Sequence, residues 1–292
     1  MYAMHFTIRP TAGLTFRILP GSILDIATYP FVPPTTLSGF LRRLAMLSAG
    51  VVFPNTGPND ESTPFYALPR QLIALGAYPV GACTRPPHRT YRKGPRDLGH
   101  SAFSAIYRGR SRGPENIQLH TWEYLVAEAF DGYVVSDDSA GLTRLAAVRG
   151  YGAKLGKEGY AFVEDVSGPF TLERNETQAH SSTIVPADAL FESNPQVAAD
   201  VFTLHSFLWR DPVTAHRQPM QGRRRRRTED TERVFSQDPF EPYPSSIVGY
   251  KPFVAALLRP SANVVLDFWY QGETFIPAQL ITILQGGTDN GQ

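Results

Sequence analysis

The chain has 292 residues, of which 42% are apolar and 12% aromatic, so it is long enough and apolar enough to bury a sizeable core. Lys and Arg number 28 and Asp and Glu 27, which leaves a net charge of +1. Any attraction to nucleic acid therefore has to come from local clustering of charge. These values exclude a chain that is disordered throughout.

The cysteine content and the apolar runs exclude several further classes of protein. A single cysteine, Cys83, excludes a disulfide framework and a cysteine-based zinc or iron–sulfur site. No stretch approaches the roughly 18 consecutive apolar residues of a membrane span, and the first residues have no basic region followed by an apolar one. We therefore expect a soluble, cytoplasmic protein. With 25 Pro and 24 Gly, turns and strands should dominate over long helices.

Alternating and helical patterns predict the elements at the start of the chain. Residues 5–9 and 14–18 alternate with a period of two and predict two strands. Residues 35–47 predict a helix that Thr35 or Thr36 caps after Pro33-Pro34. Its apolar stripe consists of Leu37, Phe40, Leu41, Leu44 and Leu47. Arg42 and Arg43 lie off this stripe and are predicted to be free to meet RNA or a partner.

Later elements follow from shorter patterns. Residues 50–64 predict a polar loop, and residues 71–78 a short apolar element. Residues 116–135 predict a strand, or mixed structure that leads to a strand, and residues 139–149 a short helix or a turn. Near the end, two apolar segments flank a predicted strand at residues 263–270; they are residues 246–250 and 253–258.

A strongly basic segment spans Thr84–Pro114. Its eight basic residues against one acid, Asp97, give a balance of +7; they are Arg85, Arg89, Arg92, Lys93, Arg96, Arg108, Arg110 and Arg112. Tyr91, Phe103 and Tyr107 are interleaved with them. Cations bind phosphates and aromatic faces stack on unpaired bases, so this combination favours single-stranded nucleic acid. The alternative is a solvated basic loop. We expect a mobile or projecting element that RNA orders.

Four glycines in ten residues precede an apolar strand at residues 150–159. Their spacing matches neither the dinucleotide fingerprint nor the P-loop, and both motifs should open a helix. Two interpretations stay open. The glycines form a plain hairpin, or they let an RNA backbone approach Tyr151, Lys154 and Lys157.

Five consecutive arginines, residues 223–227, are followed by acidic residues. Adjacent like charges cannot be buried together, so this run predicts a solvated excursion unless a polyanion covers it. The spacing of the histidines predicts no metal site. For catalysis, His88, Tyr91 and Lys93 are close enough in sequence to supply the acid, base and cation of a metal-independent ribonuclease.

Residues 33–42, Pro-Pro-Thr-Thr-Leu-Ser-Gly-Phe-Leu-Arg, resemble a signature of the CRISPR-associated RAMP superfamily. In particular they are similar to the fifth Cas family, the Cascade subunit that caps the 5′ handle of the guide RNA. Gly39 would let the helix lie close to a sheet. The glycines of residues 150–159 resemble the glycine-rich loop of the superfamily. Together these motifs cover about 35 residues.

The resemblance implies an α+β fold with a ferredoxin-like or RRM-type βαββαβ core, a β-rich second portion and a projecting basic thumb at about residues 84–114. It places the core in residues 1–174, an insertion with the arginine run in residues 175–240, and a C-terminal β-rich segment in residues 241–292. Arg85–Arg112 falls where family members carry the thumb.

The resemblance also implies a function and partners. The expected protein is a non-catalytic RNA-binding subunit of a type I CRISPR surveillance complex, a ribonucleoprotein of antiviral defence that uses no cofactor. Its partners would be the guide RNA, the backbone and large subunits, and indirectly the target DNA. Two alternatives stay open: a metal-independent endoribonuclease of the same superfamily, and an assembly protein whose arginines meet an acidic protein surface.

Overall fold

The computed structural model describes residues 1–18, 25–50, 67–93, 117–156, 159–210, 246–286 and 288–289. These residues form helices together with mainly antiparallel sheets, which confirms the α+β class. The central sheet has five strands in the spatial order β3-β6-β1-β8-β7, with every neighbouring pair antiparallel. Their bounds are β1 Tyr2–Pro10, β3 Ile73–Thr84, β6 Val126–Ser136, β7 Gly152–Leu155 and β8 Gly159–Thr171.

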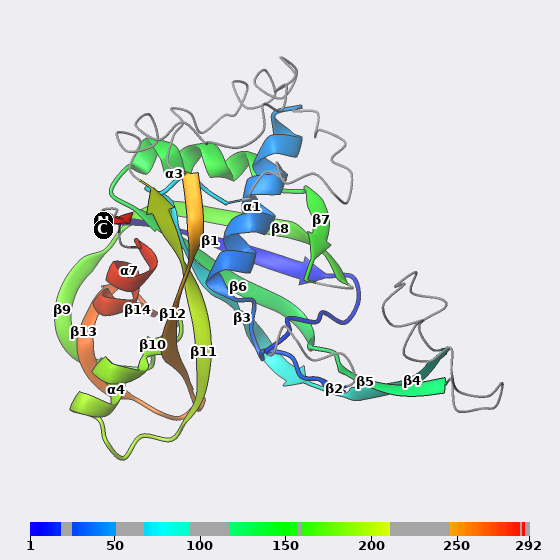
Figure 1. Cartoon of the computed structure of the whole chain (residues 1–292). Helices are drawn as coiled ribbons and strands as arrows, with labels where there is room; N and C mark the ends of the chain where they lie inside the picture. The colour runs from blue at the N-terminus through cyan, green and yellow to red at the C-terminus, as the bar shows by residue number, and fades with distance from the viewer. Residues whose placement is uncertain are drawn as a thin grey trace.

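Two helices alternate with these strands along the chain. The order is β1, α1 (Pro34–Ser48), β3, β6, α3 (Ser139–Leu145) and then β8, with β7 added at the edge of the sheet. A short 3-10 turn, Ala146–Val148, follows α3, so the helix or turn predicted at residues 139–149 is confirmed. Helix α1 lies across the sheet and contacts both β3 and β7 (Figure 1).

The predicted alternation in β1 is confirmed. Phe6 and Ile8 are fully buried, whereas His5 and Thr7, which alternate with them, are half-buried. The face with Phe6 and Ile8 is the one that α1 covers, because a side chain added at Gly132 would meet both Ile8 and Leu37. Gly132 thus lets the helix approach the sheet closely.

The second predicted strand, residues 14–18, is wrong. These residues make only isolated bridges, Leu14 with Leu125 and Arg17 with Thr28. Between the bridges, backbone and side-chain polar groups form hydrogen bonds with individual side chains and carbonyls instead of with a partner strand. The Phe16 amide donates to Thr28 Oγ1 at 2.8 Å, and Thr15 Oγ1 donates to the Glu123 carbonyl at 3.0 Å. Local bonds of this kind compete with a regular ladder.

The predicted helix is confirmed, but its predicted cap is wrong. Leu37, Leu41 and Leu44 are fully buried along α1. The N-cap position is Pro33, which makes no side-chain bond, and Pro34 occupies the first turn. A proline there has no N–H to satisfy, so the helix begins without a threonine cap.

Most of the later strands build two further sheets, in the orders β10-β12-β11-β15 and β14-β13-β9. Their bounds, with two helices, are β9 Glu173–Ala179, β10 Val185–Pro186, α4 Ala187–Ser193, β11 Ala199–Arg210, β12 Ser246–Leu258, β13 Val264–Gln271, β14 Thr274–Pro277, α7 Ala278–Leu284 and β15 Thr288–Asp289. Strand β13 confirms the prediction at residues 263–270. The predicted division at residues 174 and 240 stays a prediction, although β9 and β11 pair with β13 and β12 from the other side of it.

Residues 246–250 and 253–258, predicted as separate segments, are one continuous strand, β12. It pairs with β11 from Leu258 opposite Ala199 to Ser246 opposite Arg210. On the other side β10 reaches only residues 255 and 256. Elsewhere β12 is therefore an edge in this sheet, where Pro252 can sit without an N–H to donate.

Aromatic side chains join the central sheet to these later strands. Tyr29 Oη donates to the Thr203 carbonyl of β11 at 2.6 Å, and the rings of Phe31 and Phe202 meet edge to face at 5.5 Å. One hydrophobic core consequently runs through both parts of the molecule.

We predict that Leu41→Ala lowers the free energy of unfolding by about 2 to 5 kcal/mol, because a fully buried side chain leaves a cavity when it is shortened. Urea denaturation monitored by circular dichroism measures the loss. Leu47→Ala, at the half-buried end of the same stripe, should cost less. An equal loss in both variants would contradict the packing of α1.

Candidate nucleic-acid interface

A small three-stranded sheet carries part of the basic segment. Its order is β2-β5-β4, with β2 at Asp25–Ile26, β4 at Pro87–Lys93 and β5 at Ile117–Glu123. Strands β4 and β5 extend away from the central sheet (Figure 1). They pair antiparallel from Pro87 opposite Glu123 to Lys93 opposite Ile117. Within the segment expected to be mobile or projecting, residues 87–93 form a regular strand, and residues 94–116 lie outside the described part of the chain.

Arg85, His88 and Arg89 are exposed at the beginning of this strand. Neighbouring strand residues point to opposite faces, so Arg89 shares a face with positions 91 and 93, and His88 lies on the other face with position 92. No acidic residue occurs between positions 85 and 93. Both faces of β4 can therefore meet phosphates without a competing carboxylate on the same strand.

Aromatic rings gather at the base of β4 and β5. The rings of His88 and Tyr124 stand edge to face at 6.0 Å, and the Tyr124 amide donates to the Pro86 carbonyl at 3.2 Å. The Arg17 guanidinium lies 5.6 Å from the centre of the Trp122 ring. Tyr124 is half-buried and was not among the predicted contacts, whereas Trp122 is only 3% exposed and packs inside the base of the pair.

The glycine-rich segment forms the β7–β8 hairpin, as one of its two interpretations predicted. Two of the glycines admit the protein's own chain. A Cβ at Gly159 would lie 2.1 Å from Leu14 Cδ2, and one at Gly156 would lie 2.7 Å from the Thr15 carbonyl oxygen. Gly150 has open space around its Cβ position and a φ of 80°. Close packing against residues 14–16 thus accounts for two of the four glycines.

The outer face of this hairpin exposes two aromatic rings and a cation. Tyr151 and Tyr160 are 41% and 49% exposed. Lys154 is exposed directly opposite Tyr160 in the ladder. Such a surface offers a phosphate contact beside a ring on which a base can stack.

Residues 14–16 connect the two basic elements. On one side they pack against Gly156 and Gly159, and on the other Leu14 bridges Leu125 while Thr15 donates to the Glu123 carbonyl. The β7–β8 hairpin and the β4–β5 pair therefore flank one short segment, on the same side of the molecule in Figure 1. The fold thus brings β4 and β7, which are about sixty residues apart in the chain, to one side.

The prediction for Arg42 is wrong. Arg42 is only 8% exposed, and α1, on which it lies, contacts β11 as well as the central sheet. An arginine off the apolar stripe is therefore buried, which the local pattern did not reveal. Arg43, one residue on, is exposed as predicted.

The other predicted site residues divide by position. Arg85, Arg89, Tyr151 and Lys154 lie in the two elements that flank residues 14–16. Tyr91, Arg92 and Lys93 belong to β4, where the backbone gives their register. The predicted contacts outside the described residues are Arg108, Arg110, Arg112 and Lys157. The run Arg223–Arg227, predicted as a solvated excursion, also lies outside them.

Within the described part of the chain, His, Cys, Asp and Glu side chains form no group of three or more that could hold a metal ion. Among the same residues, no helix is both long enough and apolar enough to cross a bilayer.

Comparison with known proteins finds weak structural likeness only. No family model and no curated protein matches the chain. Among solved structures, a CRISPR protein from Archaeoglobus fulgidus is 12% identical, with a TM-score of 0.38 over 94% of this chain and 98% of that one. Two structures of the type III-B Cmr-β complex also match.

The first, bound to cognate target RNA and AMPPnP, has a chain that is 15% identical with a TM-score of 0.31, over 68% of this chain and 78% of that one. The second, bound to cognate target RNA, has a chain that is 14% identical with a TM-score of 0.34, over 89% of this chain and 86% of that one. All three are CRISPR proteins, but likeness at these TM-scores supports no conclusion about function.

We predict that Gly156→Ala is more destabilising than Gly150→Ala. Both place alanine at a positive φ, which costs about 1 to 2 kcal/mol, but only the Gly156 variant adds an overlap with the Thr15 carbonyl. Denaturation should show the difference. Hydrogen exchange at the Leu14 amide, bonded to the Leu125 carbonyl at 2.9 Å, should quicken in the Gly156 variant alone. Equal exchange in both variants would contradict the proposed packing.

Proposed function

We propose that this chain is a non-catalytic RNA-binding subunit that holds the 5′ handle of a guide CRISPR RNA in a type I surveillance complex. The proposal includes the complex's backbone and large subunits as neighbours, and target DNA as an indirect partner. The sequence motif that supports it is residues 33–42, which are similar to the RAMP signature.

One observation carries the proposal. The β4–β5 pair and the β7–β8 hairpin flank residues 14–16 and lie on the same side of the molecule (Figure 1). The first element carries Arg89, with Arg85 just before it, and the second carries Lys154 and Tyr160. Several cations on one side neutralise successive phosphates, and exposed rings stack on unpaired bases. This combination suits single-stranded RNA better than a duplex, whose bases are already stacked.

The order of the central strands gives further support. The succession β1, α1, β3, β6, α3, β8 in the spatial order β8-β1-β6-β3 is the order of a ferredoxin-like fold, which the RAMP resemblance implies. In this frame β4 and β5 extend from the end of β3 and the start of β6, where the family carries its thumb.

The register of β4 supports a binding role over a catalytic one. His88 lies on one face of the strand, and positions 91 and 93 lie on the other. An acid, a base and a cation that cleave RNA must converge on one phosphate. Residues on opposite faces of a strand do not converge without rearrangement.

We predict that Arg85→Ala combined with Arg89→Ala weakens binding of a CRISPR-repeat RNA. The slope of log K against log salt should fall by about 0.7 for each phosphate that the variant no longer neutralises. Lys154→Ala should weaken binding of the same RNA, because it removes a cation from the second element of the interface. Fluorescence anisotropy across a salt series measures both effects.

Arg144→Ala with Arg259→Ala is the matched control, since it removes the same charge outside the two basic elements. An unchanged slope in the Arg85 and Arg89 variant would exclude these side chains as phosphate contacts. If only that variant bound more weakly and the Lys154 variant did not, the interface would not extend to the β7–β8 hairpin. Failure of co-expressed guide RNA to copurify would favour an assembly protein that binds an acidic surface.

We also predict that the purified protein leaves labelled repeat RNA intact in the presence of EDTA. Gel analysis compares the wild type with His88→Ala, Tyr91→Phe and Lys93→Ala. Cleavage by the wild type that disappears in these variants would establish the endoribonuclease alternative. Cleavage that survives all three changes would mean that other residues are catalytic.

A further inference from the structure

A groove lies at the other end of the molecule, between the outer face of β9 and β13 and the helices α4 and α7. Its volume is about 700 Å³, within the range of sites that hold a ligand or a few side chains of a partner. In Figure 1 these elements lie on the opposite side from β4 and β5. The groove is therefore separate from the proposed RNA interface.

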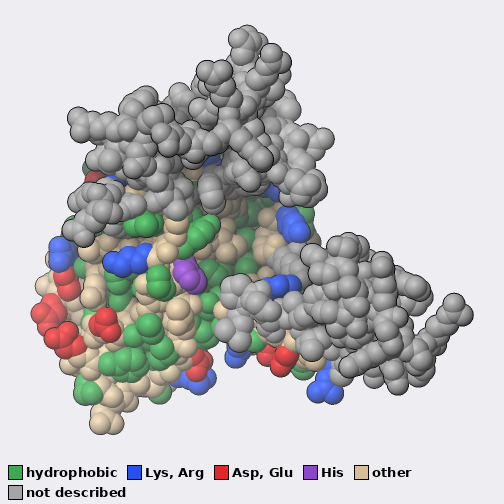
Figure 2. Space-filling view, viewed as in Figure 1, with side chains coloured by type: hydrophobic (Ala, Val, Ile, Leu, Met, Phe, Trp, Pro, Cys, Tyr) green, Lys and Arg blue, Asp and Glu red, His purple; other side chains and the backbone are tan. Residues whose placement is uncertain are grey.

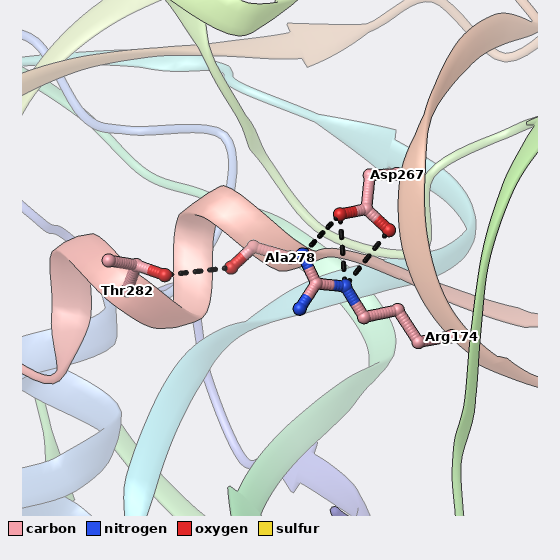
Figure 3. Close-up of polar contacts among 4 residues, drawn as sticks. All are labelled: Arg174, Asp267, Ala278 and Thr282. Carbon is pink, nitrogen blue, oxygen red and sulfur yellow. Dashed lines mark hydrogen bonds and ion pairs between the residues drawn. The ribbon is translucent and has the colours of Figure 1, made fainter.

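The floor of the groove is one face of strand β13. Val265, Asp267 and Trp269 alternate along it and line the groove, and Val265 is 39% exposed. The wall is α7, from which residues 278 and 282 line the groove at helical spacing, together with Gln285 at its C-cap. Figure 3 shows the Thr282 hydroxyl turned to the Ala278 carbonyl at 3.4 Å, so this side chain is bonded within its own helix.

Arg174 is fixed on this floor. Its Nε donates to Asp267 Oδ2 at 3.0 Å, and its Nη2 donates to the same oxygen (Figure 3). Its guanidinium lies 5.7 Å from the centre of the Trp269 ring. The hydrogen bond and the charge of Asp267 together raise the pKa of Arg174 above its usual value. This cation is therefore engaged by the protein itself and leaves the other acidic groups of the groove unbalanced.

The groove is acidic. Among the residues that the structure describes, four carboxylate side chains line it against one guanidinium; they are Asp137, Glu176, Glu192 and Asp267. Glu176 stands directly opposite Asp267 in the ladder, so it adds a negative charge beside the Arg174–Asp267 ion pair. Figure 2 shows acidic side chains gathered on this side, over β9 and β13.

We infer that this groove binds a cationic, partly apolar segment of a neighbouring protein. Lys or Arg head groups would meet Glu176 and Glu192 at the rim, and an apolar side chain or a methylene stem would cover Val265 and Trp269. Charge complementarity selects this occupant, because the same carboxylates repel the phosphates of a nucleic acid. The molecule then has two interfaces of opposite charge on opposite sides.

The test uses the full chain and a fluorescein-labelled peptide of alternating Lys and Leu, with an alternating Glu and Leu peptide for comparison. Fluorescence anisotropy should show binding of the Lys peptide only. Glu176→Gln combined with Glu192→Gln should weaken binding of the Lys peptide about tenfold. Glu128→Gln with Glu273→Gln removes the same charge at exposed positions away from the groove and should change affinity by less than about twofold.

A photo-crosslinker on the Lys peptide locates the site independently of affinity, and we expect adducts on β13 or α7. An equal loss of affinity in both double variants, or adducts confined to other elements, would overturn the inference. Binding of a uridine oligomer that is weakened by Glu176→Gln with Glu192→Gln would instead assign the groove to nucleic acid. Trp269→Ala tests the apolar floor separately from the acidic rim, because it should weaken binding of the Lys peptide without changing the net charge.

Discussion

Residues 14–16 can lie between the β7–β8 hairpin and the end of β5 because positions 156 and 159 carry no side chain. The Thr15 carbonyl and the Leu14 side chain occupy the space in which two Cβ atoms would stand. The same short segment then bonds to the start of β6 and the end of β5. The position of the small β2-β5-β4 sheet relative to the central sheet depends on this contact, and so does the placing of two basic surfaces on one side.

Patterns within short segments predicted the elements that form from residues close together in the chain. The α1 helix and the β7–β8 hairpin follow from apolar spacing and glycine content within fifteen residues, and the structure has both. Features that depend on distant partners escaped prediction. Strand β4 pairs with residues 117–123 across a segment with no apolar pattern, and α1, which carries the buried Arg42, contacts β11, which begins at Ala199. Propensity and period describe one element at a time, whereas burial depends on what the rest of the chain brings to it.

For the candidate interface too, the sequence predicted single residues but not how distant segments come together. Charge alone indicated Arg85, Arg89 and Lys154 as contacts, and all three are exposed. Charge could not indicate that the two segments are neighbours, because residues 14–16, which join them, are neither basic nor conspicuous. Nor does a net charge of +1 reveal that the acidic side chains gather at the far end, where β9 and β13 place Glu176 opposite Asp267. A near-neutral total conceals two surfaces of opposite sign.

The long β11–β12 pair has a consequence for the evolution and engineering of the chain. Arg210 and Ser246 are register partners, so the described chain leaves and re-enters this sheet at adjacent positions. For a flexible connection between two adjacent positions of a sheet, each doubling of length costs only about 0.6 kcal/mol of closure entropy. The ladder from residue 199 to 210 fixes the register of the two strands by itself. A sequence or domain inserted between Arg210 and Ser246 would therefore leave this register unchanged.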